Sequence, residues 1–290
     1  MTISVVLITH NEESNLGHTL ESVKPLVRDG QGEIIVVDSG STDGTLEIAK
    51  SFGAKVFVEP WKGYAGQKNS AIEKATGDWI LSLDADEELS KQLQQTLPHT
   101  LESLERVAAL RREADADPFM AEDARAELQN WVGVKADQEL FGIWIARKNE
   151  FLGRWIEHGG FWPDPKLRLF RRGRGRFEDR AVHETVVVNG ATATIKSGAI
   201  LHRCYPTLSD YIDHINRYSS LGAEMAVGQG RTGFSVINIV VRPLVTFVYN
   251  YFFRLGFLDG REGLLLHLYH AVYVSWKYAK TWELAHSHKS

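Results

Sequence analysis

Four short, largely apolar runs alternate with helix-like segments in the first third of the chain, and this alternation limits the fold to few classes. The runs are Ile3–Ile8, Glu33–Val37, Ala54–Val58 and Asp78–Asp84. The helix-like segments between them are Ser14–Val27, Thr45–Phe52 and Ala65–Ala75. Strands and helices that alternate at this length predict an α/β fold with a mostly parallel central sheet and helices on both faces. Ligands of such sheets bind at the carboxyl ends of the strands.

Composition places the chain among ordinary globular proteins and narrows its partners. Of the 290 residues, 43% are hydrophobic and 24% are charged, and the formal net charge is −4. This acidic balance argues against nucleic acid as a general partner. Cys204 is the single cysteine, so no internal disulfide forms, which fits a reducing, cytoplasmic location. The first residues carry no basic segment and read as a strand, so we expect no signal peptide.

Two parts of the chain are locally basic. Residues 164–180 and residues 231–290 each hold seven Lys or Arg against three Asp or Glu. The second part is also rich in aromatic residues, so we predict a catalytic domain at 1–230 and a helical, basic-aromatic extension at 231–290. Two interpretations of the extension stay open: peripheral contact with an anionic membrane, or a subdomain whose aromatic residues form a core. Arg242, Pro243 and Arg254 interrupt its apolar stretch, which disfavours a membrane-spanning helix.

Asp84 and Asp86 follow the fourth apolar run, at the predicted carboxyl end of a strand. Two carboxylates at this spacing can share a divalent cation with a diphosphate, because Mg²⁺ and Mn²⁺ prefer oxygen ligands. Three-residue patterns of this kind recur by chance, so the hypothesis depends on the position. Thr9 and Asp38 end two other predicted strands, and we expect them at the same edge of the sheet. Glu87 and its neighbour are expected to begin the next helix, where negative charge is favourable.

Several stretches together resemble family 2 glycosyltransferases with a GT-A fold, which is a Rossmann-like α/β architecture. They are Ser4–Glu12, Ile34–Thr45, Gln67–Asn69 and Asp78–Glu87. Later stretches are similar to the branch of lipopolysaccharide-core β-1,4-glucosyltransferases: Phe151–Trp155, His158–Gly160, Leu167–Phe170, Val182–Glu184 and Gly256–Gly260. The resemblance covers most of the chain and is poorest between residues 97 and 140.

The resemblance implies an inverting glycosyltransferase that moves a hexose from a nucleotide sugar, expected to be a UDP-sugar, to a saccharide acceptor. The implied acceptor is lipid-linked or a lipopolysaccharide core, within cell-envelope glycan biosynthesis. The implied location is cytoplasmic, with peripheral contact at the inner face of the cell membrane. The arginines within residues 171–176 then suit a phosphorylated or lipid-linked acceptor or bilayer headgroups, and a solvated basic hairpin is the alternative.

The resemblance also assigns a donor site. The residues implied in nucleotide-sugar binding are Thr9, Asn11, Glu12, Asp38, Lys68 and Asp84. Asp86 and His202 are implied as ligands of a divalent metal, Mg²⁺ or Mn²⁺, and His202 ends a predicted strand at 193–202. The structural alternatives are Asp38 as a helix cap, Asn11 and Glu12 as loop formers, Lys68 as a solvated lysine, and His202 as a strand-end residue.

Inverting transfer also needs a base that takes the proton from the acceptor hydroxyl, and a carboxylate is suitable. The candidates are Glu178, Asp179 and Glu184. We expect Glu184, because the resemblance places it in the catalytic acid-base motif of GT-A enzymes. A salt bridge between Glu184 and Arg180 is the alternative.

Two rival functions stand beside the transferase. A non-catalytic protein that binds nucleotide sugars, or a scaffold on the same fold, would not need Asp84 and Asp86 as metal carboxylates. A nucleotidyltransferase would need a glycine-rich, basic triphosphate loop near the N-terminus, and the sequence has none there. A hexosyltransferase is therefore the function that we expect.

Overall fold

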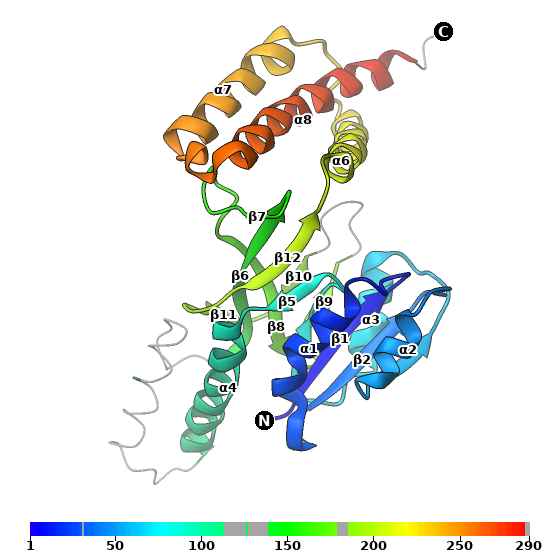
Figure 1. Ribbon diagram of the computed structural model, residues 1–290, viewed down its shortest axis with the longest axis vertical. Helices are drawn as coiled ribbons and strands as arrows, with labels where there is room; N and C mark the ends of the chain where they lie inside the picture. The colour runs from blue at the N-terminus through cyan, green and yellow to red at the C-terminus, as the bar shows by residue number, and fades with distance from the viewer. Residues whose placement is uncertain (31, 113–125, 127–138, 179–184, 288–290) are drawn as a thin grey trace. The chain divides into compact units, whose positions relative to one another are not determined.

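The computed structural model describes residues 1–30, 32–112, 126, 139–178 and 185–287 (Figure 1). These residues divide into two compact units, and each unit is described by itself. The first unit contains the described residues of 1–147, 165–178 and 185–202, and the second contains 148–164 and 203–287. The predicted division into a catalytic domain at 1–230 and an extension at 231–290 concerns function and stays a prediction.

The first unit is built on a mixed β-sheet. Its strands are β1 (Ile3–Thr9), β2 (Gly32–Asp38), β3 (Lys55–Val58), β4 (Trp79–Ser82), β5 (Glu87–Leu89), β6 (Leu140–Phe151), β8 (Asp164–Arg171), β11 (Ala191–Thr194) and β12 (Ile200–Tyr205). They are ordered β3–β2–β1–β4–β8–β6–β12–β5, and β11 also pairs with β6. A separate antiparallel pair is formed by β9 (Gly175–Phe177) and β10 (Val186–Val188). The boundaries between the units fall within β6, β8 and β12.

The strands predicted from the apolar runs form the parallel part of this sheet. β1 is parallel to β2 and β4, and β2 is parallel to β3. The register places Thr9 opposite Asp38, so the carboxyl ends of β1 and β2 adjoin. β8 is antiparallel to β4, and β12 is antiparallel to β5. The predicted α/β class, with a GT-A-like central sheet and helices on both faces, is confirmed.

Helices cover both faces of the parallel strands because side chains along a strand point alternately to opposite sides. The helices of this unit are α1 (Leu16–Val27), η1 (Arg28–Gly30), α2 (Thr45–Ser51), α3 (Tyr64–Glu73) and α4 (Lys91–Arg112). Leu7 of β1 points into the cluster that includes Leu20 of α1. Its neighbour Val6 points into the cluster that includes Ala65 of α3. Both clusters therefore anchor the carboxyl edge of the sheet from opposite sides.

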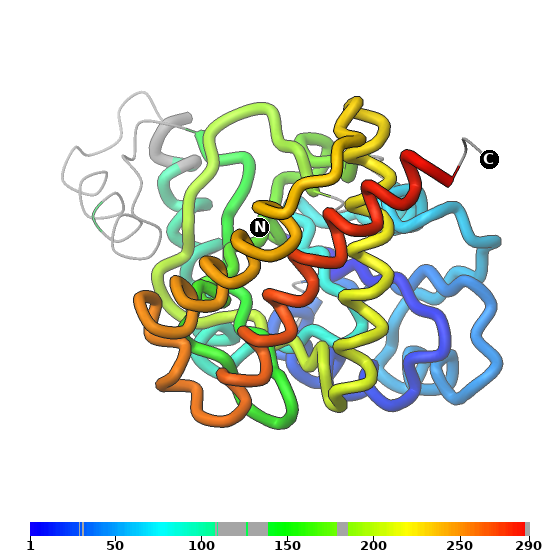
Figure 2. The backbone as a smooth tube through the Cα atoms, turned by 90° about the horizontal axis from the view of Figure 1, so that it is seen from above, coloured from blue at the N-terminus to red at the C-terminus, as the bar shows by residue number. Residues whose placement is uncertain are grey.

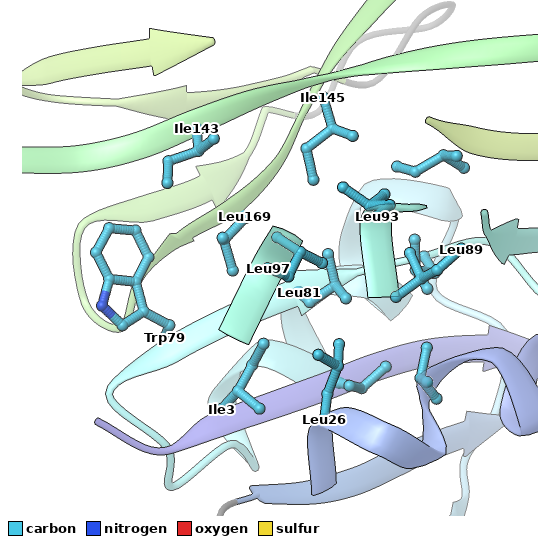
Figure 3. Close-up of a cluster of buried hydrophobic side chains, with 14 of the residues drawn as sticks. Ile3, Leu26, Trp79, Leu81, Leu89, Leu93, Leu97, Ile143, Ile145 and Leu169 are labelled. Atoms are coloured by element: carbon cyan, nitrogen blue, oxygen red, sulfur yellow. The ribbon is translucent and has the colours of Figure 1, made fainter. Parts of the chain in front are cut away.

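The larger cluster holds β4, the strand that leads to Asp84. Figure 3 shows Trp79 and Leu81 of β4 among the labelled side chains, together with Leu169 of β8. Each of these three side chains is fully buried. Burial of a large apolar side chain stabilises the fold by about 1.5–3 kcal/mol. The loop after β4 therefore begins on a rigid strand.

Helix α4 begins later than the acidic residues that precede it. The Leu93 N–H donates to Ser90 Oγ at 3.2 Å, so Ser90 caps the helix. Glu87 lies instead in β5, and the expectation that it begins the helix is wrong. Its carboxylate is fully buried and bonded to arginines, which the solvated first turn of a helix would not allow.

The predicted strand at 193–202 is divided into β11 and β12. Gly198 lies between them with φ +86°, a conformation that interrupts an extended strand. A Cβ at this position would come within 2.5 Å of the Leu93 nitrogen, so the close approach requires glycine. His202 consequently lies inside β12 and not at the end of a strand.

The second unit is mostly helical. Its elements are β7 (Arg154–Trp155), α6 (Leu208–Gly228), η2 (Ile237–Val241), α7 (Arg242–Val248), η3 (Tyr249–Phe253), η4 (Gly256–Asp259) and α8 (Gly260–Ser287). Thr207 caps α6 by accepting from the Asp210 N–H, and the Asp210 carboxylate accepts from the Thr207 N–H in return. α8 contacts α6 and α7, and Figure 2 shows α7 and α8 side by side. No helix within the described ranges has both the length and the apolar character needed to cross a bilayer.

Candidate active site

Asp38, at the end of β2, is fully buried and holds the turn that follows it. Its Oδ1 accepts from the N–H groups of Gly40 and Ser41, each at 2.8 Å. Its Oδ2 accepts from the hydroxyls of Thr9, at 2.8 Å, and Ser41. Burial alone would raise the pKa of Asp38, but the hydrogen bonds from Ser41, Thr9 and Gly40 lower that pKa. The carboxylate therefore stabilises the strand ends, and its contact with a nucleotide stays a prediction.

Asn11 and Glu12 connect the loop after β1 to the loop after β2. Asn11 has φ 56°, in the left-handed region that asparagine tolerates, and its Oδ1 accepts from the Thr42 N–H at 2.9 Å. The Glu12 N–H donates to Thr45 Oγ1 at 2.8 Å, and its carboxylate accepts from the Asn15 amide at 3.0 Å. These contacts agree with the loop-forming alternative, and they hold both residues at the carboxyl edge.

The Glu12 carboxylate also responds to the aspartates near it. Burial raises the pKa of Glu12, and the hydrogen bond from Asn15 opposes this effect. The charges of Asp86, Asp43 and Asp84 raise the pKa further. Negative charge therefore converges at this edge, an environment that a bound cation would relieve.

Asp84 binds two buried cations. Lys68 Nζ lies 2.7 Å from Asp84 Oδ1, and it also lies over the ring of Phe177 at 5.1 Å from the centroid. Arg168 Nη2 lies 2.6 Å from Asp84 Oδ2. Burial would raise the pKa of Asp84, but Arg168 and Lys68 lower it well below its usual range. Both oxygens of Asp84 are thus engaged, so the carboxylate fixes the position of the Lys68 ammonium.

Arg168 joins Asp84 to Glu87, which the sequence did not predict as a site residue. Arg168 Nη2 lies 2.7 Å from Glu87 Oε1, and Arg147 Nη1 lies 3.2 Å from the same oxygen. The Asp84 N–H donates to Glu87 Oε2 at 3.0 Å. Burial alone would lower the pKa of Arg168, but Asp84 and Glu87 raise it. A signal was present in the sequence, because an arginine inside an apolar strand needs a carboxylate partner.

The two predicted metal ligands lie together. His202 Nε2 is 3.3 Å from Asp86 Oδ2, and the side chains are 16% and 31% exposed, respectively. The pairing of β12 with β5 brings His202 there, since it lies opposite Glu87 in the register. Within the part of the chain that the structure describes, no group of three or more His, Cys, Asp or Glu side chains is arranged to hold a metal. Asp86 and Asp84 are similarly exposed, but both carboxylate oxygens of Asp84 bind side-chain cations of the protein.

The predicted base lies outside the described residues. Glu184 falls there, as do Asp179 and Arg180. Glu178 is described: it is exposed, and its N–H donates to the Thr185 carbonyl at 3.2 Å. The choice of Glu184 over Glu178 therefore stays a prediction.

A parallel sheet with buried polar groups at its carboxyl edge defines an α/β domain of the kind that binds nucleotides. The chain belongs to glycosyl transferase family 2, whose family model matches residues 4–173. It is therefore a glycosyltransferase, as the resemblance in the sequence predicted.

Relatives of similar length extend the likeness over nearly the whole chain. The lipopolysaccharide core biosynthesis glycosyltransferase LpsC of Rhizobium meliloti (strain 1021) is 29% identical over 289 residues, which cover 98% of this chain and 93% of that protein. An uncharacterized glycosyltransferase of Rickettsia felis (strain ATCC VR-1525 / URRWXCal2) is 50% identical over 272 residues, which cover 91% of this chain and 83% of that protein.

A solved structure shares a shorter stretch with this chain. It is the glucosyl-3-phosphoglycerate synthase from Mycobacterium tuberculosis in complex with Mn²⁺, uridine diphosphate and glucosyl-3-phosphoglycerate. The two are 32% identical, with 36% of this chain and 39% of that chain covered and a TM-score of 0.30. This overlap is too short to establish a likeness of the whole fold.

Proposed function

We propose that this glycosyltransferase is an inverting enzyme that moves a hexose from a nucleotide sugar, with UDP as the expected nucleotide, to a saccharide acceptor. The proposed acceptor is lipid-linked or a lipopolysaccharide core, and the proposed location is the cytoplasm at the inner face of the cell membrane. The likeness to LpsC over nearly the whole chain supports the acceptor class. The nucleotide part of the proposal rests on the family and on the carboxyl edge of the sheet.

The observation that carries the proposal is the convergence of charge after β4. Asp84 is bonded to Lys68 and Arg168, while Asp86 lies beside His202. A diphosphate needs cations, and a cation bound to a diphosphate needs oxygen ligands from the protein. At the end of the same strand, Lys68 supplies a cation for the diphosphate and Asp86 supplies an oxygen ligand for the bound cation.

The residues present suit a divalent metal, Mg²⁺ or Mn²⁺. Asp86 offers a carboxylate and His202 an imidazole. Burial is the main cause of the raised pKa of Glu12, and the charges of Asp86, Asp43 and Asp84 add to it. Mg²⁺ keeps several waters and binds one or two carboxylates together with substrate phosphates, so a pair of protein ligands is sufficient. When bound, such an ion would neutralise charge on the departing nucleoside diphosphate.

The chain's own residues divide the remaining work. In the proposed transfer, the acceptor hydroxyl oxygen bonds to the anomeric carbon, and the bond from that carbon to the diphosphate oxygen breaks. Glu184 takes the hydroxyl proton. Lys68 is held by Asp84 as a fixed positive charge for a phosphate. Arg168 holds Asp84 and Glu87 in place, so the loop that carries Asp86 is fixed before substrate arrives.

A donor screen tests the proposal. The purified chain is incubated with a set of UDP-sugars and other nucleotide sugars, with and without a lipid-linked saccharide, in Mg²⁺, Mn²⁺ or a chelator. We expect nucleoside diphosphate to be released with a UDP-hexose, faster when acceptor is present and not in chelator. Release from none of the donors under any of these conditions would reject the donor class.

The base is tested by Glu184→Gln, with Glu178→Gln as its matched control. The amide cannot take the proton, so we expect transfer to fall by about 100- to 10,000-fold while donor binding is unchanged. Glu178→Gln should transfer at the wild-type rate. Single-turnover rates and a donor titration measure the two effects, and the reverse result would assign the base to Glu178.

A further inference from the structure

The segment from η2 to η3, residues 237–253, exposes apolar side chains along one side. Those on this side include Val241, Leu244, Val245, Val248, Phe252 and Phe253. Their exposed fractions run from 37% for Val248 to 75% for Phe253. The spacing of three, four and seven residues along a helix places them on a common face. We call this surface the apolar face.

The opposite side of the same segment is fixed to α8. Pro243 is buried, and the Ser275 hydroxyl donates to the Ile239 carbonyl at 2.8 Å. The Arg242 guanidinium lies 5.3 Å from the ring centroid of Tyr278. The helix is therefore held in this orientation by contacts of its inner side, and the apolar face points to solvent.

An apolar face of this extent requires an occupant. Single exposed apolar residues are ordinary on protein surfaces, whereas a continuous row of them marks an interaction site. Charge around the face narrows the class of partner. The chain has no acidic residue between Glu224 and Asp259, but it has Arg231, Arg242 and Arg254 there. Apolar side chains flanked by cations alone match a bilayer that contains anionic lipids.

We propose that the apolar face inserts into one leaflet of an anionic membrane, with the segment 237–253 lying along the interface. Phe252, Phe253 and the aliphatic side chains enter the boundary of the acyl chains, and Arg254 meets headgroup phosphates. Insertion along the surface agrees with the finding that no described helix is suited to cross a bilayer.

The end of the apolar face also holds a loop of the second unit. The Gly159 N–H donates to the Arg254 carbonyl at 2.8 Å. Asp259, 2% exposed, accepts from the His158 N–H at 2.9 Å and lies 2.9 Å from His158 Nδ1. The loop at 158–160 therefore stays beside the membrane-facing segment. The lipid contact does not depend on the proposed function.

Vesicle flotation of the full chain tests the contact. Vesicles contain phosphatidylcholine alone or phosphatidylcholine with phosphatidylglycerol. We expect wild type to float with the anionic vesicles and to be released by high salt. Val245→Glu and Phe253→Glu should reduce the floated fraction by at least about tenfold, because a carboxylate enters hydrocarbon unfavourably. Val58→Glu is the control, since Val58 is 61% exposed and Val245 is 59% exposed.

The competing occupants give different results. Wild type that stays with no vesicle, or glutamate variants that float as wild type does, would overturn the proposal. A concentration-dependent dimer that Val245→Glu dissociates, without flotation of wild type, would assign the face to a second copy of the chain. Donor turnover is measured separately in detergent-free buffer, so loss of flotation and loss of the proposed activity are distinguished.

Discussion

The carboxyl edge of the first unit buries charged side chains, whereas the segment 237–253 of the second unit exposes apolar ones. Asp38, Lys68, Glu87 and Arg168 are each at most 7% exposed, and Phe253 is 75% exposed. Both regions depart from the usual rule that charged side chains are exposed and apolar ones are buried. The buried charges must find partners during folding, whereas the exposed apolar side chains can be covered after folding. Buried charges require their partners during folding, so they must be paired within the chain. Exposed apolar groups are tolerated by the fold and gain stability when a partner covers them.

The contrast separates what each region is built to do. Protein groups engage both carboxylate oxygens of Asp38 and of Asp84, so this part of the carboxyl edge is organised before a ligand arrives. Such preorganisation lowers the cost of stabilising charge in a transition state. The segment 237–253 is packed only on its inner side, so its apolar face depends on an external surface for burial.

Asp86→Ala tests whether the Asp86 carboxylate serves chemistry and not folding. We expect turnover to fall by about 1,000-fold or more, because the site loses several kcal/mol of charge stabilisation. The unfolding transition should stay close to wild type. Initial rates across a Mg²⁺ and Mn²⁺ titration measure the effect, and exposed Asp213→Ala serves as control. Normal turnover of Asp86→Ala would remove Asp86 as a metal ligand.

Arg168→Leu tests the buried charges as parts of the fold. The change leaves Asp84 and Glu87 buried with one cation fewer, so we expect a loss of about 3–5 kcal/mol in the free energy of unfolding. Urea denaturation measures it. Arg176→Leu, at an exposed position, should change stability by no more than about 0.5 kcal/mol. Equal stability of the two variants would show that the network does not stabilise the unit.

His267 makes the stability of the second unit depend on pH. It is 1% exposed, both its ring nitrogens lack a hydrogen-bond partner within the described residues, and burial lowers its pKa to about 4. Between pH 6.5 and about 4 the unfolded chain binds the proton and the folded chain does not, so stability falls as the pH falls. The loss reaches at most about 3 kcal/mol.

Unfolding measured at pH 7 and pH 4.5 for wild type and His267→Leu isolates this term. The variant should lose less stability on acidification, because leucine takes up no proton. His286 lies in the exposed last turn of α8, so His286→Leu should lose as much stability between pH 7 and pH 4.5 as wild type does. If the free energy of unfolding changed with pH in the same way for wild type and His267→Leu, His267 would not be the source of the pH dependence.

Phe253→Ser completes the contrast with the smallest expected effect. The side chain is 75% exposed, so its removal should change the free energy of unfolding in solution by no more than about 0.5 kcal/mol. Chemical denaturation without vesicles measures this. A loss above 2 kcal/mol, as for a buried phenylalanine, would mean that the face is covered within the protein itself.

Much of the parallel core could be predicted from the sequence, because each of its strands is marked by a local run of apolar residues. The predicted run at Ile3–Ile8 agrees closely with β1. Both faces of this strand are buried, so its sequence is continuously apolar. Asp84 and Asp86 were predicted at a strand end for the same reason. The resemblance placed His202 with Asp86, but the contact of Arg168 with Asp84 was not predicted, because Arg168 reaches it through strand pairing between distant segments. Register of such strands depends on tertiary packing, which one sequence does not specify.

The apolar face shows the opposite limit. Its composition was visible in the sequence, but the choice between a packed core and a membrane contact was not. A helix that is apolar on all sides gives no period from which to find its inner side. The burial of Pro243 and the hydrogen bond from Ser275 to the Ile239 carbonyl identify that side.

The pairing of β12 with β5 has a consequence for synthesis. A ribosome delivers Asp84 and Asp86 well before His202, and N-terminal parts of a chain begin to fold as they emerge. A nascent chain that has emerged only as far as β8 holds the carboxylate pair but lacks the strand that lies against β5. Its site is therefore incomplete, although its parallel core can already form. The Asp86–His202 pair that we propose as the metal site can therefore form only late in translation, when the strand that carries His202 has left the ribosome.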